Sequence, residues 1–350
     1  MITEHGGDIY GIDRPDILDF SINVNPLGTP RKVSVALSEA VADATRYPDL
    51  HNRALAAVLA DYHGLSPDMI LPGAGAADLI YRFAYAARPR RAIIPAPTFS
   101  EYEKALAQVR TRVFHYDCPR RHGYRIDSRI CSHITRDIDA VFLCNPNNPT
   151  GVLTNFGVIE SIARTCQEVG ALLFLDECFI DFVEEVPTAR TLLEKYPELI
   201  ILRAMTKNYA MPGVRIGYAM CSSAKMLDRM KSAGPPWQMS CFATAGALAA
   251  VECRGHLEHT REFLAEERPF LMNALREIGI SVCGGASANF VLFDGGMEDL
   301  KERLIDEDIL IRSCANYRGL SRKCYRVAVR TRPDNLRLIE ALHKVMNEAK

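Results

Sequence analysis

A lysine and an arginine eight positions apart mark the most informative stretch of the chain. Lys207 follows an apolar run that predicts a β-strand, Thr206 precedes it, and Arg215 comes just before a second such run. A lysine that attacks an aldehyde must become a neutral amine, which a sheltered site beside other positive charge favours. The planar fork of an arginine suits a phosphate. The spacing predicts a site that holds an aldehyde cofactor as a Schiff base and clamps its phosphate; exposed cations in a strand–loop–strand unit are the alternative.

Two polar motifs follow predicted strands upstream of this lysine. Asn148 lies in the run Asn-Pro-Asn-Asn-Pro-Thr-Gly over residues 145–151, a tight turn in which its amide could donate to a phenolate-like oxygen. Asp176 ends the apolar run 171–175, where a carboxylate is costly without a cationic partner. A protonated pyridine nitrogen is such a partner and supports electron-sink chemistry. A plain strand-to-helix turn and an aspartate bonded to a loop amide are the alternatives.

A loop of small residues opens a helical stretch earlier in the chain. Gly75, Ala76 and Ala77 precede the helical pattern of residues 79–86. Small residues at the start of a helix allow backbone N–H groups to approach a phosphate. The third glycine of a dinucleotide-binding fingerprint is absent, so the loop fits a phosphate cradle or a simple turn.

A sheet must bring these motifs together. Continuous apolar runs predict strands that are buried on both faces, as in parallel sheets with crossover helices, and ligands bind at the carboxyl ends of such strands. The runs are 91–94, 140–144, 171–175, 199–202 and 216–220. After residue 237 helical patterns (242–251, 256–278, 335–346) surround short strands (289–293, 309–312, 325–329). We expect an α/β protein with an N-terminal arm (1–30), a large domain (31–236) and a smaller α+β domain (237–350).

Composition excludes several classes of function. The 350 residues are 48% hydrophobic and 24% charged, with a formal net charge of −1, so neither nucleic acid nor an anionic membrane is expected as a partner. No apolar run reaches the roughly 20 residues of a membrane helix, and the N-terminus does not resemble a signal peptide. The eleven cysteines show no metal-binding spacing. Reduced thiols in a cytoplasmic enzyme without a metal are expected.

Taken in order, these motifs resemble those of the fold-type-I pyridoxal phosphate (PLP) enzymes, the aminotransferase class I and II superfamily. The resemblance covers essentially the whole chain and implies PLP as the cofactor and a mostly parallel mixed sheet between helices. It implies catalytic roles for Lys207 and Asp176. The residues implied to contact the cofactor are Tyr47, Gly75, Ala76, Ala77, Phe99, Asn148, Asp176, Thr206, Lys207 and Arg215. Tyr47 would reach the cofactor phosphate of a partner subunit, so a homodimer is implied.

The two ends of the chain narrow the branch. Residues 5–8, 19–28, 311–320 and 325–330 resemble the L-threonine O-3-phosphate decarboxylases of cobalamin biosynthesis, which are close to histidinol-phosphate aminotransferases. This resemblance implies a small phosphorylated amino-acid substrate, O-phospho-L-threonine, and the product (R)-1-aminopropan-2-ol O-phosphate. It implies that Arg330 binds the substrate carboxylate. It also implies that Arg312 binds the substrate phosphate, near His5 and Asn148.

Three alternatives stay open at this point. The chain could transfer the amino group of histidinol phosphate, could prefer O-phospho-L-serine, or could bind ligands without turnover. Arg312 and Arg330 could be surface cations, and His5 could be solvent-exposed. The sequence also departs from the family pattern: Ala204 replaces a hydroxyl residue, Ser240 replaces an asparagine, and Phe179 stands where aminotransferases often carry tyrosine.

Overall fold

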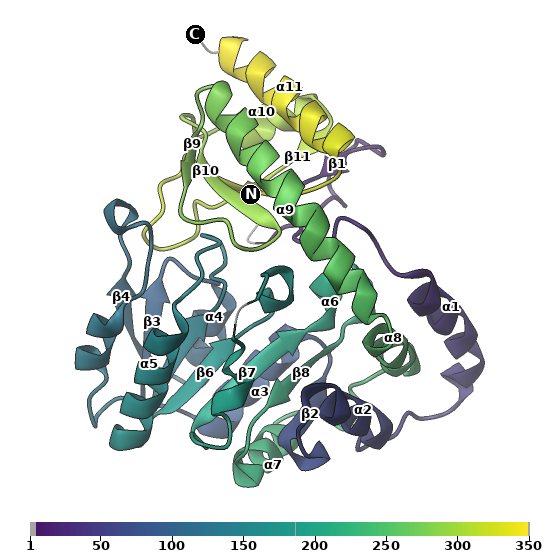
Figure 1. Cartoon of the computed structure of the whole chain (residues 1–350), viewed down its shortest axis with the longest axis vertical. Helices are drawn as coiled ribbons and strands as arrows, with labels where there is room; N and C mark the ends of the chain where they lie inside the picture. Colours follow the sequence, from purple (N-terminus) through teal and green to yellow (C-terminus); the bar gives the residue numbers. More distant parts are fainter. Residues whose placement is uncertain (1–4, 186, 349–350) are drawn as a thin grey trace.

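A computed structural model of the chain describes residues 5–185 and 187–348, so residues 1–4 of the expected arm lie outside it. A large sheet with helices on its faces forms one region, and a smaller sheet with its own helices forms a second (Figure 1). The long helix α9 (Arg254–Glu277) runs from the first region to the second. The α/β fold expected from the sequence is confirmed.

The large sheet has seven strands in the spatial order β2-β8-β7-β6-β5-β3-β4. The five from β7 to β4 are parallel, whereas β8 runs antiparallel to both of its neighbours. The bounds are β2 Ile70–Gly73, β3 Arg91–Ala96, β4 Arg112–Asp117, β5 Ala140–Cys144, β6 Leu172–Asp176, β7 Leu199–Ala204 and β8 Gly217–Met220. The expected mixed, mostly parallel sheet is therefore confirmed; β2 and β4 were not expected.

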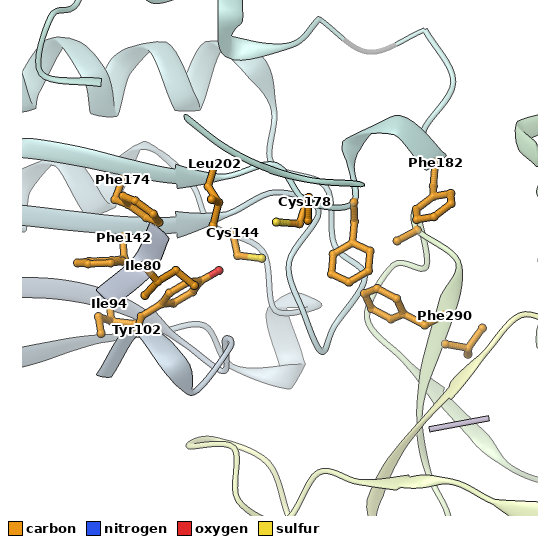
Figure 2. Packing of buried hydrophobic residues seen from close by; sticks show 14 of the residues in the cluster. Ile80, Ile94, Tyr102, Phe142, Cys144, Phe174, Cys178, Phe182, Leu202 and Phe290 are labelled. Atoms are coloured by element: carbon orange, nitrogen blue, oxygen red, sulfur yellow. The ribbon is translucent and has the colours of Figure 1, made fainter. Parts of the chain in front are cut away.

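Apolar side chains cover both faces of this sheet and hold the helices on it. Phe142 of β5 and Phe174 of β6 (Figure 2) lie 5.2 Å apart by ring centroid. The ring of Phe83 in α3 lies 4.6 Å from that of Phe174. Complete burial of one such side chain contributes about 1.5–3 kcal/mol. The helices of this region are α1 Arg31–Glu39, α2 Arg53–His63, α3 Ala76–Ala87, α4 Glu101–Gln108, α5 Phe156–Val169, α6 Met205–Asn208, α7 Ala224–Ser232 and α8 Cys241–Val251.

The smaller sheet is antiparallel, in the order β12-β13-β10-β9. Its strands are β9 Ser281–Cys283, β10 Phe290–Asp294, β12 Arg312–Ser313 and β13 Cys324–Ala328, and its helices are α9, α10 Leu300–Asp306 and α11 Arg332–Glu348. The expected strand 309–312 is divided at Ile311 between β11 (Ile309–Leu310) and β12. α8, which follows residue 236, packs against α1 and α2 of the large region. The domain boundary at residue 236 stays a prediction.

The N-terminal segment is attached to the second region by backbone pairing. β1 (Leu18–Asp19) runs parallel to β11, and the N–H of Ala328 in β13 donates to the carbonyl of Phe20 at 2.8 Å. Residues 20–25 therefore lie beside the strand that carries Arg326, at the junction of the two regions.

The described residues were compared with the sequence predictions on membrane helices, cysteines and metal sites. No helix between residues 5 and 348 combines the length and apolarity required to cross a bilayer. All eleven cysteines are free thiols. The described ranges contain no cluster of His, Cys, Asp or Glu suited to a metal ion.

Candidate active site

One cavity lies where the carboxyl ends of β5, β6 and β7 face residues 21–23 and β13. It gathers side chains from the N-terminal segment, the large sheet and the small sheet. Ten residues expected in a site line it: His5, Ala76, Ala77, Phe99, Asn148, Asp176, Thr206, Lys207, Arg215 and Arg312. Tyr47, Gly75 and Arg330 are not part of the lining.

Lys207 lies in the short helix α6 directly after β7 and is half-buried. Burial lowers the pKa of its amine to about 8, and the positive charges of Arg326 and Arg215 act in the same direction. Its backbone carbonyl accepts the N–H of Asn25 at 2.9 Å, which fixes the turn that presents the side chain. A neutral, nucleophilic amine is thus accessible near neutral pH.

Asp176 is the last residue of β6 and is only 4% exposed. The hydroxyl of Tyr102 donates to Oδ2 at 2.6 Å, and the backbone N–H of Cys178 donates to Oδ1 at 2.9 Å. Burial raises the pKa of this carboxyl, the hydrogen bonds oppose that rise, and no cation among the described residues contributes. A cationic group bound in the cavity would favour the ionised carboxylate.

The start of α3 and Arg215 together form a place for an anion. Helix α3 begins at Ala76, directly after Gly75, whose φ is +90°. A Cβ on Gly75 would lie 2.8 Å from Nη2 of Arg215, so only glycine lets the guanidinium come this close to the helix N-terminus. Backbone N–H groups and a guanidinium at one point suit a phosphate. Gly75 therefore acts through its shape, behind the cavity lining.

The two arginines of the run 326–330 have different places. Arg326 lines the cavity and is 5% exposed; it donates to Oδ1 of Asn148 and, at 2.9 Å, to the carbonyl of Ser21. Arg330 donates to Asp334 at 3.0 Å and to the carbonyl of Asp19 at 3.2 Å, outside the cavity. The substrate role expected for Arg330 thus finds no support in its position, because β13 ends at Ala328 and the chain turns away into α11.

The remaining wall carries further positive charge. Arg312 is 3% exposed, donates to Oδ1 of Asn316 at 2.8 Å, and lies 5.5 Å from the ring of Tyr317. His5 borders the cavity although its side chain is solvent-exposed. Its Nε2 lies 3.1 Å from the carboxylate of Glu101. The wall that faces Lys207 is therefore suited to an anionic ligand.

Phe179 and Ala204, noted in the sequence as departures from the family pattern, also line the cavity. The lining residues to which the sequence assigned no role are Gly6, Ser21, Ile22, Asn23, Cys144, Cys178, Tyr317 and Arg326. Asn23 is 2% exposed, and its Oδ1 has no hydrogen-bond partner among the described residues; the same holds for Nε of Arg326. Both residues line the cavity, although these two atoms are themselves enclosed by protein. The run Ser-Ile-Asn-Val-Asn over 21–25 belongs to a segment that resembles the family, but its place at the cavity depends on pairing with β13.

Tyr47 and Ser240 occupy positions away from the cavity. Tyr47 is 83% exposed and packs beside Trp237, with ring centroids 5.0 Å apart and planes tilted by 38°. Its role across a dimer interface stays a prediction. Ser240 caps α8, where its Oγ accepts the N–H of Ala243.

These residues fit a flat, phosphorylated pyridine aldehyde. The amine of Lys207, the buried carboxylate of Asp176 and the ring of Phe99 line one cavity, and no described cation acts on the carboxylate. The N-terminus of α3 and Arg215 would hold the phosphate.

Comparisons with known proteins agree with this arrangement. The family model for aminotransferase class I and II matches residues 15–342. Threonine-phosphate decarboxylase from Salmonella typhimurium is 37% identical over 98% of this chain and 97% of its own. A bifunctional protein of adenosylcobalamin biosynthesis from Leptospira interrogans is 28% identical over 98% of this chain and 41% of its own. The structure of histidinol-phosphate aminotransferase from Clostridium acetobutylicum is similar, with a TM-score of 0.88, 30% identity, and coverage of 95% of this chain and all of the other.

Proposed function

This chain belongs to the aminotransferase class I and II family, and we propose that it decarboxylates O-phospho-L-threonine to (R)-1-aminopropan-2-ol O-phosphate. Its cofactor is PLP. Within that family, the relative of the same length with 37% identity is a threonine-phosphate decarboxylase, whereas the similar histidinol-phosphate aminotransferase structure has 30%. The similarity to a protein of adenosylcobalamin biosynthesis supports a role for the product in the cobalamin side chain.

One observation carries the proposal. Two buried guanidinium groups, Arg312 and Arg326, line the same cavity as the amine of Lys207. Arginine pairs with both carboxylate and phosphate through two parallel hydrogen bonds. A substrate with a carboxylate, a phosphate and an amine matches this set. We assign the carboxylate to Arg326 and the phosphate to Arg312, with His5 and Asn148 beside it.

The protein's own groups decide which bond at Cα breaks. Bound PLP supplies an electron-withdrawing ring, and the Cα bond perpendicular to that ring is the one that is weakened. Arg326 and Arg312, from strands β13 and β12, would hold the two anionic ends so that the carboxylate is the perpendicular group. Asp176 would keep the ring nitrogen protonated, and Phe99 would cover the ring face. After loss of CO2, Lys207 would deliver a proton to Cα.

The proton delivered by Lys207 gives a test in heavy water. The protein, loaded with PLP, is incubated with O-phospho-L-threonine in 2H2O, and the products are followed by NMR. We expect 1-aminopropan-2-ol O-phosphate with one deuterium at C1, because the lysine amine exchanges with solvent. A 2-oxo acid in place of the amine would contradict the proposal and indicate transamination.

The same assay decides the substrate. O-phospho-L-serine lacks one methyl group, which a pocket distinguishes by about 1–3 kcal/mol, or roughly 10- to 200-fold in kcat/KM. We expect O-phospho-L-threonine to be preferred by at least about 10-fold. Equal or reversed preference would assign the chain to decarboxylation of O-phospho-L-serine.

A further inference from the structure

A tyrosine outside the cavity lining contacts two of the groups that would face the cofactor ring. Tyr102 is the second residue of α4 and is 1% exposed. Its hydroxyl donates to Oδ2 of Asp176 at 2.6 Å. Its ring meets that of Phe99 edge to face, with centroids 5.6 Å apart and planes at 84°. One side chain therefore touches both the carboxylate expected at the ring nitrogen and the aromatic expected on the ring face.

We propose that Tyr102 is a positioning residue that holds Asp176 ionised and oriented for the cofactor ring nitrogen, and so sets the affinity for a cofactor with a basic ring. This inference rests on the expected pairing of Asp176 with the ring nitrogen, and it assigns a role to a residue that does not line the cavity.

Among the residues that the structure describes, the Tyr102 hydroxyl has no other strong acceptor than Asp176. Its ring packs between Phe99 and Phe142, the latter at 5.4 Å, and Figure 2 shows the hydroxyl pointing toward Cys144 beside the end of β5. The Cys144 thiol is a weak partner of the same hydroxyl. Burial raises the pKa of Tyr102 well above its usual range, so the hydroxyl remains a donor. The Tyr102 hydroxyl can contact both Cys144 and Asp176 because these two residues are direct partners in the register of β5 and β6.

The hydrogen bond opposes the effect of burial on Asp176. Burial favours the neutral carboxyl, whereas donors aimed at its oxygens favour the carboxylate, and Oδ2 receives the donor from Tyr102 at the shortest distance. Without the hydroxyl, Asp176 would be protonated at a higher pH and would pair less well with a ring nitrogen that must carry a proton. The backbone N–H and the thiol of Cys178 would remain as donors to the carboxylate.

The decisive experiment varies the protein and the cofactor together. Apoprotein of wild type and of Tyr102→Phe is titrated with PLP and with its analogue in which carbon replaces the ring nitrogen, and the dissociation constants are compared. Fluorescence of the single tryptophan, Trp237, or equilibrium dialysis reports binding without any turnover. Tyr102→Phe keeps the ring and its packing and removes only the donor.

We expect Tyr102→Phe to weaken PLP by about 10-fold or more, since hydrogen bonds to charged groups have this size, and to leave the carbon analogue unchanged within about twofold. In an Asp176→Asn background the substitution should have no further effect on PLP. Tyr116→Phe is the matched control: it removes a hydroxyl 3.5 Å from Asp127, far from the cavity, and should leave both constants unchanged.

An equal loss of affinity for PLP and for the carbon analogue would overturn the proposal, because Tyr102 would then act through packing alone. An unchanged affinity for PLP would overturn it as well. If Tyr102→Phe does not fold, 3,5-difluorotyrosine at position 102 replaces it, since this ring keeps its shape and its hydroxyl donates more strongly. Preference for PLP over the carbon analogue should then stay or increase, and a decrease would overturn the inference. None of these outcomes depends on which substrate is decarboxylated, so failure here is distinguishable from failure of the proposed function.

Discussion

At the scale of single residues, the amine of Lys207 is the group whose protonation the site controls most directly. Burial lowers its pKa to about 8, and Arg326 and Arg215 add to the effect. Because an unfolded lysine titrates near 10.4, the folded state releases its proton about two units earlier. Burial of the Lys207 amine therefore lowers the stability of the folded protein at every pH at which the amine carries its charge.

This cost has a defined dependence on pH. Below pH 8 both states hold the proton, and the penalty is complete. Between about 8 and 10.4 the unfolded state binds more protons, so the stability of the folded state rises with pH. Urea unfolding of apoprotein should show wild type gaining about 2 kcal/mol relative to Lys207→Met between pH 7.5 and 9.5. A difference between the two proteins that does not change with pH would contradict the low pKa.

The two arginines at 326 and 330 make a matched pair for a second prediction. Arg326→Gln removes the guanidinium proposed to bind the substrate carboxylate and should lower kcat/KM by about 100-fold, as expected for loss of a charged, bidentate partner. Arg330→Gln removes contacts with Asp334 and the Asp19 carbonyl and should lower the thermal midpoint while kcat/KM falls less than about 10-fold. The reverse order of the two kinetic effects would return the carboxylate to Arg330.

At the scale of elements, the turn that carries Lys207 is held by a segment far away in the sequence. The side-chain amide of Asn25 donates to the carbonyl of Asn208 and to the hydroxyl of Thr260 in α9, both at 2.7 Å. Its own N–H donates to the carbonyl of Lys207. α6 is one turn long and cannot hold its own geometry, so this contact positions the amine.

Asn25→Ala tests this tether. The change removes the donor to the Asn208 carbonyl, while the Thr260 hydroxyl keeps its bond to the carbonyl of His256. The loss should cost about 1–3 kcal/mol of unfolding free energy, and it should also lower kcat. Asn155→Ala removes the cap of α5 at an exposed position, with a cost of about 1 kcal/mol, and should leave kcat unchanged. Measured by thermal unfolding and initial rates, a loss of stability without any loss of kcat in Asn25→Ala would show that the tether does not position the lysine.

The elements also show what the sequence could and could not predict. The runs at 140–144, 171–175 and 199–202 became β5, β6 and β7 because continuous apolar residues have no other stable place than a strand covered on both faces. Those strands put Asn148, Asp176 and Lys207 at one edge. The choice between Arg326 and Arg330 could not be made in this way. It depends on where β13 ends and which face of it meets residues 20–23, which is a tertiary contact.

Tyr102 is a second case. Its sequence position, three residues after Phe99, identifies it as part of the same helix start, but its contact with Asp176 arises only when α4 packs on the sheet beside β6. The three-residue spacing of Phe99 and Tyr102 indicates that the two rings lie close together. It could not specify that the hydroxyl would meet a carboxylate 74 positions later.

At the scale of the whole molecule, three distant parts of the chain meet at the cavity, and in the homodimer that we propose Tyr47 of a partner subunit would add a fourth. It is 83% exposed beside Trp237, which is 46% exposed. Exposed aromatic pairs are common at protein–protein interfaces. A homodimer in which Tyr47 reaches the neighbouring active site remains our proposal.

Complementation between two inactive variants tests this arrangement. A dimer of Tyr47→Ala with Lys207→Ala would contain one site with both an intact lysine and an intact tyrosine. After random exchange of subunits, half of the dimers are mixed and one of their two sites is active, so about one quarter of wild-type activity should return. Activity no higher than the sum of the two parents would show that Tyr47 serves its own subunit or neither site.

The central claim, decarboxylation of O-phospho-L-threonine, is tested most directly by carboxyl-labelled substrate and PLP-loaded protein without any 2-oxo acid. We predict labelled CO2 in a one-to-one ratio with 1-aminopropan-2-ol O-phosphate, and none from Lys207→Ala, because the amine that binds the cofactor is also the proposed proton donor. Absence of CO2, together with glutamate formed when 2-oxoglutarate is added, would contradict the account and assign the chain to amino-group transfer.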